Sequence, residues 1–164
     1  MSKIKLLILL LTSFIIIACT VSHQPSRQFK LNYIGGNEDG LIFSNILHSH
    51  LESFGIFNSN SNYQINSSIN HEQNLYITNV NKTSDREMII STISAEIFDQ
   101  NQNCIIYIYK NKVKQFYVIT ANINYTSNKK AVEGIKRENA EALSKKLIYS
   151  LINLKDDNCD GQRQ

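Results

Sequence analysis

Cysteine and histidine, the residues that most often bind metals or act as nucleophiles, are few in this chain of 164 residues, with three Cys and four His. His48 and His50 lie two positions apart in a segment predicted to be helical, so they point to different sides and cannot share one metal ion. His23 lies in a polar tether and His71 in an expected loop. We therefore expect no metal site.

Cys104 is a candidate thiol nucleophile, but its surroundings carry none of the local motifs of cysteine enzymes. The sequence also lacks a Gly-rich phosphate loop, a serine nucleophile elbow and an HExxH zinc motif. We therefore expect a protein that is not an enzyme, with no catalytic residue and no cofactor. The alternative for this side chain is a buried or disulfide-bonded cysteine.

Cys19 stands at the end of a segment with the pattern of an export signal. Lys3 and Lys5 form a basic head, and residues 6–18 form a mostly apolar run. These thirteen residues suit a signal peptide and are too few to span a bilayer, which needs about 20. We expect the signal to occupy residues 1–18.

The segment Ile16-Ile17-Ala18 before Cys19 is similar to a bacterial lipobox, in which the signal is cleaved before a cysteine that carries the lipid. Several acyl chains make such an anchor stable, at about 0.8 kcal/mol per buried methylene. Thr20 stands where an Asp would retain a lipoprotein in the inner membrane. We therefore expect a lipid anchor in the outer membrane on the periplasmic side. The alternative is an ordinary secretory signal that happens to contain a cysteine.

The mature chain predicted by this cleavage has 146 residues (164 − 18), which is the size of one domain. The formal charge of +3 falls to +1 when Lys3 and Lys5 leave with the signal. A nearly neutral chain is not drawn to nucleic acid by bulk electrostatics, so we expect no nucleic-acid partner.

The pattern of apolar residues predicts a flexible tether over 19–28, one domain over 29–154 and a polar tail over 155–164. Within the domain we expect a strand at 29–34, a helix at 41–54, strands at 88–98 and 104–118, and a helix at 129–153. Either Asn37 or Asp39 is expected to cap the first helix. Residues 63–81 form either one long strand with a bulge or two short strands.

This order of elements favours a two-layer α/β sandwich, with two helices packed on one face of a four-stranded, mostly antiparallel sheet. In the strand at 88–98, alternate residues form the drier face: Ile89, Ser91, Ile93, Ala95 and Ile97.

Three lysines, Lys110, Lys112 and Lys114, recur at period two on one side of the strand at 104–118. We call these three residues the lysine row. The simpler interpretation is a solvated face or an edge strand protected by its charges. The functional interpretation is a site for an anionic group such as phosphate.

Taken together, the segments resemble the LPS-assembly lipoprotein family (LptE), in particular its alphaproteobacterial branch. Beyond the lipobox at Cys19, the likeness rests on the stretches LHSHLESFG, REMIISTISAEIFDQNQNCII and KVKQFYVITANINYTSNKKAVEGIKRENAEALSKKLIYSL. The resemblance implies the same two-layer fold. It also implies a protein that plugs a large outer-membrane β-barrel (LptD-like), assists its assembly and contacts lipopolysaccharide.

Basic residues near strand ends are implicated in lipid contact in that family. The candidates in this chain are Lys82, Arg86, Lys110, Lys112 and Lys114. The alternative function is a generic periplasmic lipoprotein of a secretion or envelope-maintenance complex.

Cys104 and Cys159 are the only thiols that remain once Cys19 is lipidated, and the periplasm is oxidising. The last predicted helix runs back along the preceding strand and brings the tail within reach of Cys104. The sequence therefore allows a disulfide between the two, with a small buried Cys104 and an unbonded tail as the alternative.

Overall fold

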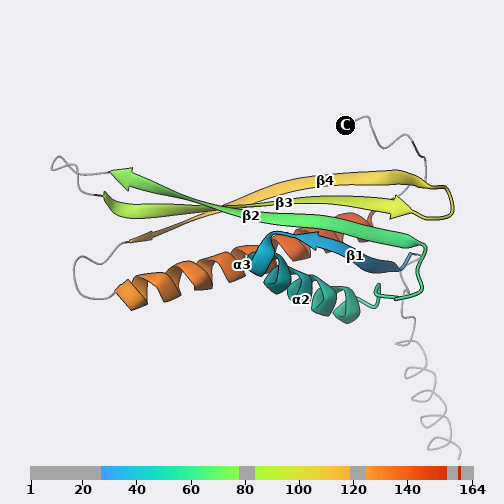
Figure 1. Ribbon diagram of the computed structural model, residues 1–164, viewed down its shortest axis with the longest axis horizontal. Coiled ribbons are helices and arrows are strands. Elements are labelled where there is room, and N and C mark those ends of the chain that lie inside the picture. The colour runs from blue at the N-terminus through green and yellow to red at the C-terminus, as the bar shows by residue number, and fades with distance from the viewer. Residues whose placement is uncertain (1–26, 78–83, 119–124, 155–158, 160–164) are drawn as a thin grey trace, which may run out of the picture.

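The computed structural model describes residues 27–77, 84–118, 125–154 and 159 (Figure 1). Cys19 and Lys82 lie outside these described residues. The elements follow in the order β1 (Phe29–Gly35), α2 (Asn37–Ser53), β2 (Tyr63–Ile77), β3 (Ser84–Asp99), β4 (Cys104–Val118) and α3 (Tyr125–Ile152).

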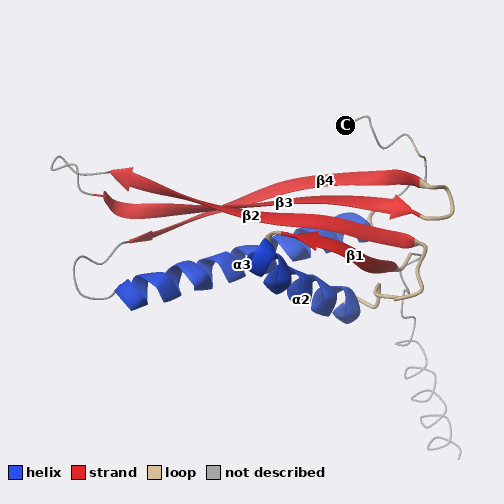
Figure 2. Ribbon diagram, in the orientation of Figure 1, coloured by secondary structure: helices blue, strands red, loops and turns tan. Residues whose placement is uncertain are grey.

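The four strands form one sheet in the order β1-β2-β3-β4. β1 is parallel to β2, because α2 connects them, whereas β2 with β3 and β3 with β4 are antiparallel pairs. Both helices lie on the same side of this sheet (Figure 2). The predicted two-layer sandwich of two helices on a four-stranded, mostly antiparallel sheet is confirmed.

The strands differ in length, and this difference shapes the sheet. β1 pairs only with Tyr63–Ser68 of β2, whereas β2 pairs with β3 along its whole length. β2, β3 and β4 therefore continue past β1 as a long three-stranded ribbon, and the first half of α3 runs beneath it (Figure 1).

The core lies between the sheet and the two helices. All five residues of the predicted drier face of β3 are buried, as expected from their alternation. Ile93, Ala95 and Ile97 pack with apolar residues of α2 and α3, which recur at spacings of three and four: Phe43, Leu47 and Leu51, and Ala140, Leu143, Leu147 and Leu151. Within the described residues, both helices therefore leave the other side of the sheet uncovered.

The turn between β1 and α2 consists of Gly36, whose φ of 119° is in the left-handed region. The prediction that Asn37 or Asp39 caps α2 is wrong, because the helix already begins at Asn37 and no side chain caps it. Gly36 takes the cap position instead, since its φ lets the chain reverse within one residue.

Residues 63–77 form one strand, so the two-strand alternative for this part is wrong, while 78–83 lie outside the described residues. His71 lies in β2 and not in a loop. α3 begins at Tyr125, four residues before its predicted start at 129. Polar residues at the start of α3 and along β2 gave no apolar periodicity from which these parts could be predicted.

Candidate functional site

The lysine row lies on the face of the sheet that the helices leave open. Lys110, Lys112 and Lys114 are all exposed, and the alternate residues of β4 face the helices. Successive members are about 6.6 Å apart along the strand. Their partners across β3 are uncharged: Ser94, Thr92 and Ile90.

Apolar side chains lie on the same face at the end of β4. Phe116 is 56% exposed and Val118 is 65% exposed, and both share the parity of the lysine row. Ile108 lies at the other end of the row and is also exposed. This side of β4 therefore combines a line of positive charge with exposed apolar surface.

The lysine row places three positive charges on this face, and exposed Glu96 of β3, opposite Ile108, places a negative charge near Lys110. None of its ammonium groups forms an ion pair or hydrogen bond within the described residues. Arg86 pairs with Val118 across the strands and shares the same face, so it adds a positive charge beyond Lys114. Glu72 lies two strands away from Lys114, across Ile90. An anionic group could therefore contact several cations of this face at once.

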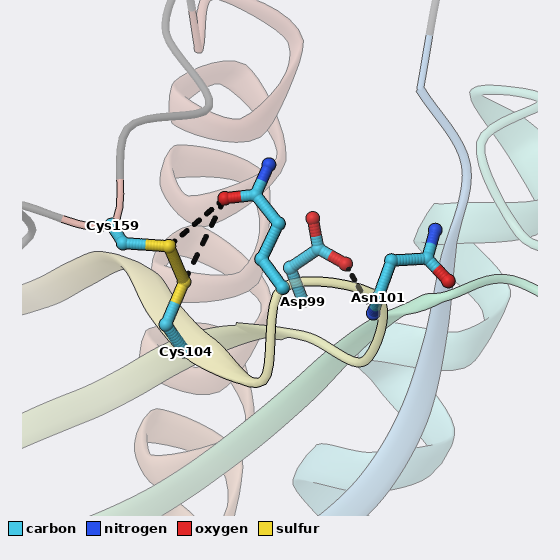
Figure 3. Close-up of a disulfide and its surroundings, with 5 residues drawn as sticks. Asp99, Asn101, Cys104 and Cys159 are labelled. Atoms are coloured by element: carbon cyan, nitrogen blue, oxygen red, sulfur yellow. Dashed lines mark hydrogen bonds between the residues drawn. A yellow bond between two sulfur atoms is a disulfide. The ribbon is translucent and has the colours of Figure 1, made fainter.

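Of the two states that the sequence left open for Cys104, the structure shows the disulfide with Cys159. Cys104, the first residue of β4, is disulfide-bonded to Cys159, with Cα atoms 5.7 Å apart (Figure 3). The side-chain oxygen of Gln102 lies 2.9 Å from the sulfur of Cys159. Cys104 is therefore not free to act as a nucleophile in this structure.

A hydrogen-bonded cluster that the sequence analysis missed lies on the side of the sheet that faces the helices. His71 of β2 and Ser91 of β3 are direct cross-strand partners, and Nδ1 of the imidazole is 2.7 Å from the serine Oγ. The buried amide of Asn139 in α3 donates to the same Oγ at 2.9 Å. We call His71, Ser91 and Asn139 the interior polar cluster. It joins two strands to α3.

An ion pair borders the interior polar cluster and links the two helices. Lys136 Nζ in α3 lies 3.4 Å from Asp39 Oδ2 in α2. Burial lowers the pKa of His71, as does the positive charge of Lys136, while Asp39 acts in the opposite direction. His71 is therefore harder to protonate in the folded protein than in the unfolded chain.

The sequence contained one signal for this cluster. Ile65, Ser67 and Ile69 are buried at alternate positions of β2, and His71 continues that series. The pattern placed His71 on the inner face, but its polar character favoured a loop. The contact with Asn139 depends on the register between α3 and the sheet, which no local pattern specifies.

A second histidine contact lies between the helices. His50 Nδ1 in α2 is 2.9 Å from Ser144 Oγ in α3. Burial lowers the pKa of this imidazole, Lys145 lowers it further, and Glu141 acts in the opposite direction. His48 instead faces Glu52, 3.7 Å away, so the two histidines of α2 point in different directions as predicted.

Among the described residues, no group of three or more His, Cys, Asp or Glu could hold a metal ion. Neither of the helices in the described chain, α2 or α3, is long and apolar enough to cross a membrane. The open face with its lysine row is the surface of the described chain with the clearest potential for binding.

Comparison with solved structures shows where this fold occurs. The rare lipoprotein B from Shewanella oneidensis superposes with a TM-score of 0.60 at 8% identity, covering 74% of this chain and 92% of that chain. A minor lipoprotein from Acinetobacter baumannii superposes with a TM-score of 0.58 at 15% identity, covering 77% of this chain and 90% of that chain. A lipoprotein B from Nitrosomonas europaea superposes with a TM-score of 0.54 at 10% identity, covering 78% of this chain and 86% of that chain.

No family model matches the chain, and no curated protein matches it in sequence. Identities this low show a shared fold and nothing finer. The chain therefore has the α/β fold seen in these solved bacterial lipoproteins.

Proposed function

We propose that this protein is an outer-membrane lipoprotein, anchored through Cys19 on the periplasmic side. It plugs and helps to assemble an LptD-like β-barrel that translocates lipopolysaccharide, and it assists insertion of that lipid at the cell surface. The observation that carries the proposal is the open sheet face, where the lysine row adjoins exposed Phe116 and Val118. Lipopolysaccharide is complementary to this face, because its phosphates match the lysines and its acyl chains match the apolar side chains.

The lipobox and the fold support the same proposal. The segment before Cys19 has the pattern of a lipoprotein signal, and the fold is one that bacterial lipoproteins adopt. The long ribbon of β2, β3 and β4 has polar side chains on its open face, at Asn70, Glu72 and Thr92, which suits a contact with the hydrated interior of a barrel.

The test is recovery of the partner. The tagged protein is crosslinked in cells, extracted in detergent and purified by affinity, and the proposal expects a one-to-one complex with a large outer-membrane β-barrel. An obligate plug buries more than about 2,000 Å² in its partner, so the complex should survive stringent washing.

The control is the same purification from cells that express an unrelated outer-membrane lipoprotein with the same tag. If the purified material contains no β-barrel protein beyond that background, the plug function is wrong. Recovery of periplasmic or secretion-machine subunits instead would support the alternative, a lipoprotein of a secretion or envelope-maintenance complex.

A further inference from the structure

We propose that a patch on the outer surface of the two helices rests on the headgroup region of the membrane that holds the lipid anchor. The patch consists of Phe54, Lys145, Tyr149 and Ile152, and we call it the end patch. The inference rests on the proposed lipidation of Cys19 but not on the barrel partner. It assigns a second, non-covalent contact between this domain and lipid.

The end patch is an exposed apolar surface built by both helices. Phe54 at the end of α2 is 36% exposed, and Tyr149 and Ile152 of α3 are 57% and 42% exposed. The rings of Phe54 and Tyr149 meet edge to face, with centroids 5.8 Å apart. Their mutual contact fixes both rings at the surface.

The basic member of the end patch lies on the same stripe of α3. Lys145, Tyr149 and Ile152 follow each other at spacings of four and three, so they share one face of the helix. Lys145 is exposed, as is Lys146 beside it. Aromatic rings beside lysines are characteristic of surfaces that lie at the interface of an anionic membrane.

The position of the tether places the end patch near the anchor. Arg27 Nη1 donates a hydrogen bond to the carbonyl oxygen of Leu154, 2.8 Å away, just past the end of α3. The amide of Phe29 likewise donates to the carbonyl oxygen of Ile56, just past the end of α2. The chain therefore enters the domain at the helix ends that bear the end patch.

The length of the tether limits how far the domain can stand from the bilayer. Arg27 lies eight positions after Cys19 (27 − 19), and a fully extended chain over eight such steps spans at most about 29 Å. The lipidated Cys19 is held at the membrane surface. The short tether therefore keeps this end of the domain close to the membrane, whose apolar interior and anionic headgroups complement the end patch.

The chain offers a direct test because it contains no tryptophan. Tyr149→Trp places the only tryptophan of the chain in the end patch, where its emission can be excited apart from the tyrosines. The protein is used full-length and lipidated, reconstituted into vesicles of phosphatidylethanolamine and phosphatidylglycerol. Brominated acyl chains in those vesicles should quench this fluorescence strongly, and the less polar surroundings of the indole should shift its emission to shorter wavelength. The matched control is Tyr33→Trp, at an exposed position of β1, which should stay unquenched.

Charge is tested separately in the unlipidated Cys19→Ser chain. Lys145→Gln should weaken its binding to phosphatidylglycerol vesicles about fivefold, as expected for one basic group at an anionic surface. Lys130→Gln, an exposed lysine near the other end of α3, should leave that binding unchanged.

Each outcome identifies which idea is wrong. If the lipidated protein does not float with vesicles, the anchor itself is wrong and this inference falls with it. If it floats but Tyr149→Trp is quenched no more than Tyr33→Trp, only the end patch is wrong. A spectral shift that depends on protein concentration without vesicles would identify a second copy as the partner and overturn the proposal.

Discussion

Nδ1 of His71 lies 2.7 Å from Oγ of Ser91, its direct partner across β2 and β3. The amide of Asn139 donates to the same oxygen, so the serine proton is free to point to the imidazole. Protonation of His71 would place a second proton in this contact. The pair therefore stabilises the fold with the imidazole neutral.

The pH dependence follows from the sign of the shift. The pKa of His71 is below its ordinary value of 6.5 in the folded protein, so the unfolded chain binds the proton more readily. The free energy of unfolding should therefore decrease as the pH falls through 6.5 toward the folded pKa. His50 acts with the same sign. Urea unfolding of wild type and His71→Gln at several pH values from above 6.5 downward measures this pH dependence of the free energy of unfolding.

The expected result is a shallower pH dependence in His71→Gln than in wild type, because the variant lacks one of the two histidines of the described chain whose pKa is lowered. Ser91→Ala serves as a companion, since it removes the hydroxyl but keeps the imidazole. It should cost about 1–3 kcal/mol at neutral pH by leaving buried Asn139 Nδ2 without its acceptor. An identical slope in wild type and His71→Gln would contradict this account.

The disulfide between Cys104 and Cys159 closes a loop of 55 residues. In the chain-entropy model a loop of this length stabilises the fold by about 4 kcal/mol. Reduction should lower the free energy of unfolding by about that amount. Urea unfolding with and without reductant measures the difference, and the double variant Cys104→Ser, Cys159→Ser should match the reduced protein.

Thiol counting on the denatured, unreduced mature protein checks the bond itself. The expected count is no free thiol, since Cys19 carries lipid and the other two cysteines are bonded. Two free thiols per chain would rule the disulfide out.

Two glycines should respond to alanine with opposite signs. In Gly36→Ala the new Cβ would lie 2.6 Å from the carbonyl oxygen of Ile69, at a φ of 119° that L-residues rarely adopt. The expected cost is about 2–3 kcal/mol of unfolding free energy. Gly134 lies in the interior of α3, and apart from its chain neighbours and the backbone of its own helix no atom lies within 4 Å of its new Cβ, so Gly134→Ala should stabilise by about 0.5–1 kcal/mol.

Thermal unfolding of both variants beside wild type provides the measurement. The pair controls for the general effect of added methyl groups, because only the backbone conformation and surroundings differ. Equal melting temperatures for the two variants would show that the turn tolerates a side chain.

The two-layer fold could be predicted because its determinants are local. The alternation of Ile89, Ile93 and Ile97 specifies one buried face of β3, and the apolar stripe of α3 specifies which side of the helix is buried. The ends of the elements could not be predicted equally well. Gly36 stands where a side-chain cap was expected, and the polar residues at the start of α3 gave no apolar stripe that marks where this helix begins.

The candidate site divides in the same way. The lysine row follows from period-two spacing alone, and the structure places it on the open face. The interior polar cluster joins residues 71, 91 and 139, and the end patch joins residues 54 and 149. Contacts over such sequence distances depend on how helices dock on the sheet. Side-chain periodicity predicts the buried face of each element but not its register against another.

Lipidation of Cys19 is tested by Cys19→Ser. The variant should carry no lipid, because the thiol that accepts the diacylglycerol is missing, and it should no longer fractionate with the outer membrane. Metabolic labelling with a palmitate analogue, followed by membrane fractionation, measures both properties. Labelling that persists in the variant would show that another residue carries the lipid or that the label is not an acyl chain on this protein.

The lysine row is tested by changing Lys110, Lys112 and Lys114 together to Ser. Binding of purified lipopolysaccharide should weaken, because three exposed cations on the open face are lost. Its remaining affinity should depend less on salt, since screening acts on the charges that were removed. Titration of lipopolysaccharide at low and high ionic strength measures both effects.

The matched control changes three exposed cations of α3, Lys129, Lys130 and Arg137, to Gln. Net charge falls equally in both variants, but only the first loses charge from the open face. Far-ultraviolet circular dichroism and urea unfolding should show both variants folded, because none of these six side chains is buried. If the two variants bind lipopolysaccharide equally well, the lysine row is a solvated face that protects an edge strand, and its charges act only through the net charge of the protein.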